Sequence, residues 1–266
     1  MFCIHSYYDF SMQVSTKISE FGQKVRAFSD LISDVIVPNT CLICDVFVDQ
    51  QGGCCASCWS KLAFVHPPLC PVMGTPFSVD MGKNFLSAEA IANPPPFQRL
   101  RTVLIYDDFA RKLVSLIKYS DRTDLAPWIA RWMQVAGKEL LSEADMILPV
   151  PLHHARLRNR RFNQSAELAR HIGNLSGVAY EPEILIRRKA TRQQVGLTEN
   201  ERERNVSGAF SVPERFKPQL SGKSVILLDD VYTTGATAKA ACRALKRGGA
   251  SNIDVLVFAK VESGAL

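Results

Sequence analysis

One short stretch, VILLDDVYTTGAT at residues 225–237, constrains the fold more than any other part of the chain. Four apolar residues run into two adjacent aspartates, and a turn rich in threonine and glycine leads into a helical pattern. Continuously apolar strands are typical of parallel sheets that are covered on both faces. Ligands of such sheets bind beyond the carboxyl ends of the strands, where Asp229 and Asp230 lie. The stretch therefore predicts an α/β fold with a ligand site at this strand end.

The chain from residue 99 onward alternates between strand-like and helix-like segments. We expect strands at 100–108, 145–152, 224–230 and 252–261, and helices at 109–120, 125–141, 163–177 and 237–250. The segments 183–189 and 208–212 are further candidate strands. This alternation predicts a mostly parallel sheet flanked by helices. No internal repeat is evident in the sequence.

The residues that follow the two aspartates suit a ribose 5-phosphate. Carboxylates accept hydrogen bonds from vicinal hydroxyls, and they also bind divalent cations such as Mg²⁺. The N–H groups at the start of the next helix, near Ala236, would bind phosphate, and Gly235 would let the backbone approach the anion. Hydroxyl donors are supplied by Thr233, Thr234 and Thr237. In the alternative interpretation, Asp230 caps the turn and the threonines only solvate it.

Two arginine-rich stretches are candidates for gripping the rest of a charged ligand. The first, at 149–169, contains Arg156, Arg158, Arg160 and Arg161. Guanidinium groups match phosphate oxygens bidentately, so this loop could hold a pyrophosphate; a solvated basic loop is the alternative. The second, at 187–210, is interpreted as a mobile flap over the ligand, with an ordinary charged connector as the alternative.

The cysteines predict a structural zinc site. Two C-x-x-C pairs, Cys41 with Cys44 and Cys55 with Cys58, are separated by ten residues. Each pair places two thiolates on one tight turn, and two such turns complete a tetrahedral Zn²⁺ site with no open position. Cys54 could replace Cys55, although its spacing to Cys58 is less usual.

These features divide the chain into four predicted parts. They are an N-terminal segment with an amphipathic helix (1–37), a small zinc-ribbon module (38–76), a linker (77–98) and the α/β domain (99–266). The apolar stripe at 13–36 is expected to dock on the same chain, with a partner helix or a membrane surface as alternatives. No apolar run approaches the ~20 residues that a membrane span needs, and no secretory signal is visible. We therefore expect a cytoplasmic protein.

The stretch at 225–237 resembles the phosphoribosyl diphosphate signature of the type I phosphoribosyltransferases. That resemblance implies that Asp229 and Asp230 bind the ribose hydroxyls together with Mg²⁺, and that Thr233 through Thr237 hold the 5-phosphate. The net charge of +6 suits a partner that carries phosphates, but it identifies none.

Nearly the whole chain, from about 38 to 266, resembles the ComF family of competence proteins, which includes GntX-type proteins. The matching motifs are PVPL at 149–152, FNQ at 162–164, T-x-x-Q-x-x-L at 191–197 and R-x-x-N-x-x-x-A-F at 202–210. The segment LIKYSD resembles the Lys-Tyr step of the family and implies that Lys118 faces the ligand. Arg161 stands where the family usually has glycine, so this turn has less backbone freedom. The family often has a third cysteine pair, but here Met73 replaces its second cysteine, so we expect no second zinc and interpret Cys70 as a remnant.

The resemblance implies a phosphoribosyltransferase that handles incoming single-stranded DNA in the cytoplasm, beside competence proteins such as a helicase. The sequence offers no nucleophile triad and no recognisable acceptor pocket, so the catalytic residues and the acceptor stay unknown. The alternative function is a non-catalytic module that senses phosphoribosyl diphosphate or a nucleotide, or that binds single-stranded DNA. DNA binding would require stacking on Phe162, Trp128 or Trp132, which are otherwise expected to be core residues.

Overall fold

The computed structural model describes residues 39–41, 43–49, 53–119, 125–153, 162–191 and 198–262. The chain divides into two compact units, residues 1–57 and 58–266, and each is considered by itself. The amphipathic helix expected at 13–36 lies outside the described residues. Among the helices that are described, none combines the length and the apolar character needed to cross a bilayer.

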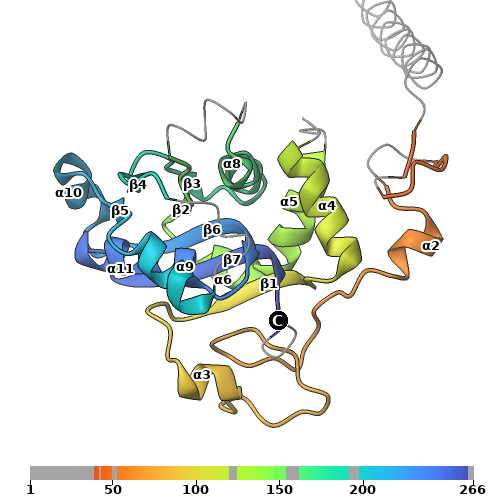
Figure 1. Ribbon diagram of the computed structural model, residues 1–266, viewed down its shortest axis with the longest axis horizontal. Helices are drawn as coiled ribbons and strands as arrows, with labels where there is room; N and C mark the ends of the chain where they lie inside the picture. The colour runs from red at the N-terminus through yellow and green to blue at the C-terminus, as the bar shows by residue number, and fades with distance from the viewer. Residues whose placement is uncertain are drawn as a thin grey trace, which may run out of the picture. The chain divides into compact units, whose positions relative to one another are not determined.

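The larger unit is built on a five-stranded sheet in which all neighbours are parallel (Figure 1). The strand order is β1-β7-β6-β2-β3. The strands are β1 (Leu100–Ile105), β2 (Met146–Pro149), β3 (Ala179–Tyr180), β6 (Ser224–Tyr232) and β7 (Asn252–Lys260). This arrangement confirms the predicted parallel sheet.

Helices cover both faces of the sheet, and several shorter elements connect them (Figure 1). On one face α5 (Ala126–Ala136) packs against α8 (Gln164–Ser176), with α4 (Asp108–Tyr119) beside them. On the other face α11 (Ala236–Arg247) packs against β6, β7 and α9 (Glu199–Val206). The shorter helices are α2 (Ala56–Trp59), α3 (Ala88–Ala92), α6 (Lys138–Glu143), η2 (Glu214–Phe216) and α10 (Lys217–Leu220). The flanked sheet is the predicted α/β architecture.

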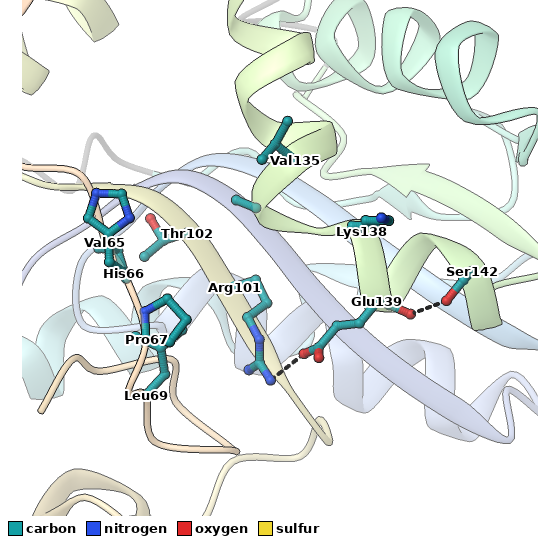
Figure 2. Close-up of a pocket in the computed structure, with 11 residues that line it drawn as sticks. Val65, His66, Pro67, Leu69, Arg101, Thr102, Val135, Lys138, Glu139 and Ser142 are labelled. Atoms are coloured by element: carbon teal, nitrogen blue, oxygen red, sulfur yellow. Dashed lines mark hydrogen bonds and ion pairs between the residues drawn. The ribbon is translucent and has the colours of Figure 1, made fainter. Parts of the chain in front are cut away.

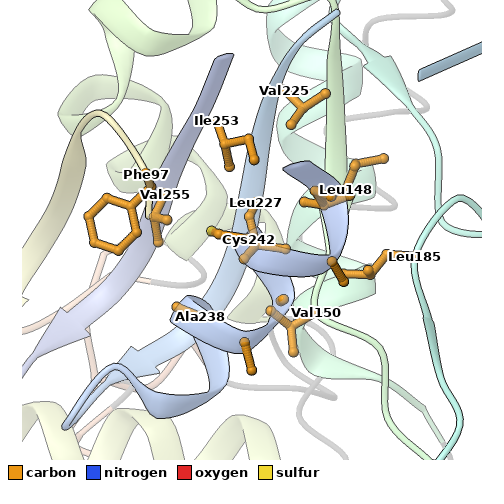
Figure 3. Packing of buried hydrophobic residues seen from close by; sticks show 14 of the residues in the cluster. Phe97, Leu148, Val150, Leu185, Val225, Leu227, Ala238, Cys242, Ile253 and Val255 are labelled. Carbon is orange, nitrogen blue, oxygen red and sulfur yellow. The ribbon is translucent and has the colours of Figure 1, made fainter. Parts of the chain in front are cut away.

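The core explains why the central strands are apolar throughout. Leu227 and Val255 pack with Ala238 and Cys242 of α11 (Figure 3), while Ile226 is also completely buried. Adjacent strand residues point to opposite faces, so both faces of β6 are removed from water. Cys242 is thus a buried apolar residue, as expected.

Three local expectations need correction. The segment 125–141 forms two helices that meet at Gly137, where a Cβ would lie 2.8 Å from Leu256 Cδ2, so the close helix–sheet approach requires glycine. The candidate strands at 183–189 and 208–212 form only β4 (Ile186–Arg187) and β5 (Phe210–Ser211), which pair antiparallel with each other outside the main sheet. β6 continues past both aspartates to Tyr232.

The segment before β1 also differs from the expected irregular chain. The predicted linker 77–98 contains α3, which begins after an N-cap at Ser87. Two short antiparallel bridges, Thr40 with Phe47 and Leu69 with Pro76, close hairpins of equal length. The two hairpins therefore repeat one backbone pattern. In the sequence only the spacing of Cys70 and Met73 indicates this repeat, because few corresponding residues are identical.

Candidate ligand site and candidate metal centre

A cavity of about 280 Å³ lies beyond the carboxyl ends of β2 and β6. It brings together five of the predicted site residues, namely Lys118, Asp229, Asp230, Thr233 and Thr237. These residues come from α4, β6 and the β6–α11 turn, which are far apart in sequence. The predicted residues Arg156 and Arg160 lie outside the described residues.

The two aspartates hold different partners inside this cavity. Asp229 Oδ1 accepts hydrogen bonds from Ser165 Oγ at 2.9 Å and from the N–H of Asp230 at 2.9 Å. Asp230 Oδ2 lies 2.9 Å from Lys118 Nζ. Both aspartates line the cavity, although they are adjacent in sequence.

The electrostatics of the pair favour a cationic partner. Burial raises the pKa of Asp229 to about 7, and the nearby Asp230 carboxylate adds to the rise. The hydrogen bonds from Asp230 N–H and Ser165, together with the charge of Lys118, act in the opposite direction. Two crowded carboxylates with hard oxygen donors fit a divalent cation such as Mg²⁺, which would relieve their repulsion.

The turn after β6 has a backbone conformation that requires glycine at position 235. Gly235 has a φ of +74°, and a Cβ there would lie 2.1 Å from the Tyr232 hydroxyl oxygen, so no other residue fits without rearrangement. α11 begins at the next residue, Ala236, as predicted, so its first N–H groups are available to an anion. The buried Thr234 Oγ1 has no hydrogen-bond partner among the described residues.

A smaller cavity of about 30 Å³ lies within this turn. It is lined by residues that include Thr233, Gly235, Ala236 and Thr237. Backbone N–H groups, threonine hydroxyls and a helix N-terminus therefore converge on one small space, which is the chemistry of an anion site.

Sequence reasoning missed several polar residues of the cavity that contains the two aspartates. They are Tyr106, Gln164, Ser165, Arg187 and Arg202. The signal for Arg187 was a charged residue on an otherwise apolar strand, and its side chain is buried with its guanidinium carbon 5.2 Å from the centre of the Phe210 ring. Arg202 comes from α9, and its buried Nε has no hydrogen-bond partner in the described part of the chain. Both arginines belong to the stretch that was interpreted as a flap.

The placement of Ser165 follows from the start of α8. Asn163 caps this helix, with its Oδ1 accepting the N–H of Ser165 at 3.2 Å. Its Nδ2 donates to the carbonyl oxygen of Val150 at 3.1 Å, just beyond β2. The FNQ motif therefore fixes the helix start beside the strand end, where Ser165 reaches Asp229.

The metal centre brings together the four predicted cysteines. The Sγ atoms of Cys41, Cys44, Cys55 and Cys58 all lie within 4.8 Å of one another. Burial opposes ionisation of Cys41, but the N–H groups of Cys55, Ile43 and Cys44 outweigh it and lower the pKa of Cys41 to about 6. Four thiols in this cluster, one of them readily ionised, suit structural Zn²⁺.

Cys54 does not belong to this cluster. Burial, followed by the nearby Cys41 and Cys55 thiolates, raises the pKa of Cys54 to about 12. The thiol cluster contains Cys55 and not Cys54, so the structure favours Cys55 as the ligand, as the spacing predicted.

A larger cavity of about 630 Å³ lies beside β1, away from the aspartates (Figure 2). Its lining includes His66, Lys138 and the ion pair of Arg101 with Glu139. The pairing compensates both of these charges. We assign it no ligand.

The aromatic residues named as possible base-stacking platforms are partly engaged elsewhere. Trp132 packs edge-on against Trp59 and Phe64, with ring centroids 5.5 and 5.7 Å apart, and stacks on Phe258 at 6.4 Å. Trp132 is therefore a packing residue, which agrees with the core alternative.

Comparisons with known proteins agree with this geometry. Residues 166–266 match the family described as "Phosphoribosyl transferase domain", and residues 32–90 match the "Double zinc ribbon domain". The chain thus combines a zinc ribbon with a phosphoribosyltransferase domain.

Three relatives identify the family more closely. "DNA utilization protein YhgH" of Escherichia coli O6:H1 is 30% identical over 82% of this chain and 96% of its own length. "Competence protein ComFC" of Bacillus subtilis is 27% identical over 80% of this chain and 91% of its own. "Competence protein F" of Haemophilus influenzae is 29% identical over 56% of this chain and 66% of its own length. The protein belongs to the ComF/YhgH family of competence and DNA utilization proteins.

Proposed function

We propose that this protein binds phosphoribosyl diphosphate with Mg²⁺ and transfers its phosphoribosyl group during the handling of DNA taken up by the cell. The observation that carries the proposal is the pair of carboxylates, Asp229 and Asp230, in the same cavity as a glycine-threonine turn at a helix N-terminus. Ribose hydroxyls need hydrogen-bond acceptors, which the two carboxylates provide. A 5-phosphate needs N–H and hydroxyl donors, which the turn at 233–237 provides a few residues later.

Each predicted residue has a chemical role in this proposal. Asp229 and Asp230 would accept hydrogen bonds from the ribose hydroxyls and would hold the cation, whose charge would favour departure of pyrophosphate. Residues 233–237 bind the 5-phosphate through N–H groups and hydroxyls. Lys118 and the loop carrying Arg156 and Arg160 attract the pyrophosphate, and Arg187 and Arg202 add positive charge on another wall of the cavity.

No protein nucleophile is needed for this reaction. The bond between the anomeric carbon and pyrophosphate weakens first, and positive charge develops on the ribose ring. Fixed dipoles and exclusion of water then provide the catalysis. The stretch 187–210, which supplies Arg187 and Arg202, would close the site.

The biological role is supported by the names of the relatives. "Competence" and "DNA utilization" describe proteins that act on incoming DNA, and we extend that role to this chain. Acting in the cytoplasm on single-stranded DNA, beside a helicase or another competence protein, would fit the net charge of +6.

Calorimetry with phosphoribosyl diphosphate and Mg²⁺ tests the site. The parent should bind, and the double variant Asp229→Asn/Asp230→Asn should lose at least ~100-fold in affinity, because two charged hydrogen-bond acceptors are removed. Glu214→Gln is the matched control, since Glu214 is exposed and pairs only with Lys217 three residues away. A parent protein that does not bind the ligand would refute the proposal.

A non-catalytic sensor or a single-stranded-DNA-binding module is the second candidate. It is favoured by the size of the cavity, about 280 Å³, which is at the small end for ligand sites and leaves little room for an acceptor. Release of pyrophosphate in the presence of DNA or nucleobases would support transfer. Binding without turnover would support the sensor, and DNA affinity that falls steeply with salt would support the DNA-binding module.

A further inference from the structure

Two hairpins of this chain have the same backbone hydrogen-bond pattern. In the first, the N–H of Cys41 donates to Val46 O at 2.7 Å and the N–H of Asp45 donates to Cys41 O at 3.0 Å. The N–H of Val48 donates to Asn39 O at 2.9 Å and closes the hairpin. Asp45 adopts a φ of +61°, which a residue with a side chain rarely does.

The second hairpin repeats this pattern 29 residues further along the chain. The N–H of Cys70 donates to Thr75 O at 2.8 Å, and the N–H of Gly74 donates to Cys70 O at 2.9 Å. The N–H of Phe77 donates to Pro68 O at 2.9 Å, and Gly74 has a φ of +59°. Each of these three bonds in the first hairpin thus has a counterpart in the second. The residue with a positive φ, Asp45 or Gly74, also occupies the same position in both hairpins.

The second half of each ribbon also corresponds. The N–H of Cys55 donates to Cys41 Sγ at 3.3 Å, and α2 begins at the next residue. The N–H of Ser87 donates to Cys70 Sγ at 3.3 Å, and α3 begins at the next residue. Ser87 therefore occupies the position of Cys55.

The remaining metal-ligand positions follow from the same alignment. Met73 lies three residues after Cys70, where the first hairpin has Cys44 three residues after Cys41. Ala90 lies three residues after Ser87, as Cys58 lies three residues after Cys55. The match to a double zinc ribbon covers residues 32–90, so all four of these positions lie within the matched range.

We propose that residues 68–93 are a second zinc ribbon that has lost its metal and is held instead by burial against the phosphoribosyltransferase domain. Three of its four ligand positions carry Met73, Ser87 and Ala90, and only Cys70 keeps a thiol. Neither an alanine methyl nor a single thiol can complete a tetrahedral zinc site. The hydroxyl of Ser87 is already used, because it accepts the N–H of Ala90 at 3.4 Å as the cap of α3.

Packing takes the place of the metal. Cys70 and Met73 are 0% and 1% exposed, and they join the same apolar cluster as Phe97 and Leu100 of the α/β domain. In the first ribbon, Cys41 and Ile43 are also buried, but neither belongs to that cluster, and Cys44 is exposed. Apolar burial contributes about 25 cal/mol per Å², which can replace the cross-link that a metal supplies.

Polar contacts fasten the metal-free ribbon to the sheet. Lys260, at the end of β7, is buried and donates to Thr75 Oγ1 at 2.8 Å and to Glu89 Oε2 at 3.0 Å. Along β1, the N–H of Leu100 donates to Val72 O at 2.7 Å, and Arg101 donates to the carbonyl oxygen of Pro71 at 3.1 Å. Both halves of the second ribbon are therefore bonded to the domain that carries the ligand site.

Zinc analysis of the full-length protein tests this proposal. We expect one zinc per chain, loss of that zinc in Cys41→Ser/Cys58→Ser, and no change in Cys70→Ala. Two zinc ions per chain, or a loss of zinc in Cys70→Ala while Cys41→Ser/Cys58→Ser retains it, would overturn the proposal.

Restoring the missing ligands provides an independent test. The triple variant Met73→Cys/Ser87→Cys/Ala90→Cys, which retains Cys70, should bind a second zinc and raise the stoichiometry from one to two. If the folded variant gains no zinc, the alignment of ligand positions is wrong. Should the triple variant fail to fold, Ser87→Cys/Ala90→Cys with Co²⁺ is the alternative: new thiolate-to-cobalt absorption that disappears in Cys70→Ala supports the alignment, and its absence contradicts it.

Discussion

The two ribbons share a backbone but depend on different forces. The first brings four thiols within 4.8 Å of one another, while the second has buried apolar side chains and an ion pair between the buried Lys260 and the partly buried Glu89. A metal cross-link is local and needs no large core, whereas burial requires a partner surface. The difference teaches that the same hairpin can serve as an independent metal module or as part of a larger domain.

Removing zinc should produce the largest difference in stability between the two ribbons. In hydrogen exchange with a chelator, we expect the amides of Asp45 and Val48 to lose at least ~100-fold of their protection, because metal binding supplies most of the folding free energy of such a module. The equivalent amides of Gly74 and Phe77 should change less than ~3-fold. Equal loss in both hairpins would mean that the second ribbon also depends on metal.

Breaking the Lys260–Glu89 ion pair should affect the second ribbon next most strongly. Lys260→Met leaves the partly buried Glu89 without its charged partner and should lower the free energy of unfolding by about 2 kcal/mol. Chemical denaturation measures this change. Lys260→Met/Glu89→Gln is the matched control and should recover part of the loss; a single variant as stable as the parent would show that the pair does not hold the ribbon.

The two left-handed residues allow a matched comparison of the hairpins. Gly74→Ala should cost about 2 kcal/mol, because the new Cβ would lie 2.5 Å from Leu100 O in addition to the strain of a positive φ. Asp45→Gly relieves the same backbone strain in the first hairpin and should change stability by less than ~1 kcal/mol. Thermal unfolding of the zinc-loaded protein distinguishes them. Equal effects at both positions would contradict close packing of the second hairpin.

Removing the Asp229 charge from the ligand cavity should stabilise the protein, whereas removing the Lys260 charge from the second ribbon should destabilise it. The pKa of Asp229 is raised to about 7, so the folded protein disfavours its charged form. This penalty is absent below about pH 4 and complete above pH 7, so without Mg²⁺ Asp229→Asn should stabilise the protein by about 1–2 kcal/mol at pH 8 and by little at pH 4.

Asp145→Asn is the control for this pH dependence. The N–H of Ser224 and the ammonium group of Lys223 lower the pKa of Asp145, so its contribution is present above pH 4 and is lost in acid. Asp145→Asn should therefore destabilise the protein at pH 8. A stabilising effect of Asp229→Asn that grows toward acid pH would contradict the assigned burial.

Several parts of the molecule could be predicted because their signals are local. The apolar run before Asp229, the glycine at 235 and the spacing of the cysteines each reflect backbone geometry within a few residues. The parallel sheet and the start of α11 at Ala236 were predicted for this reason. The break at Gly137 was missed because it depends on Leu256 of a distant strand.

The sequence by itself determined the class of fold, the four clustered cysteines and the turn that suits a phosphate, since each is encoded in consecutive residues. Only the tertiary structure decided that Arg187 and Arg202 line the same cavity as the aspartates, and that Lys260 bonds to Thr75 and Glu89. The sequence had already indicated a remnant site at Cys70 and Met73, and the structure added the hairpin hydrogen bonds and the corresponding position of Ser87. Backbone geometry can persist while side chains change, because burial against a neighbouring domain can replace the metal that once selected them.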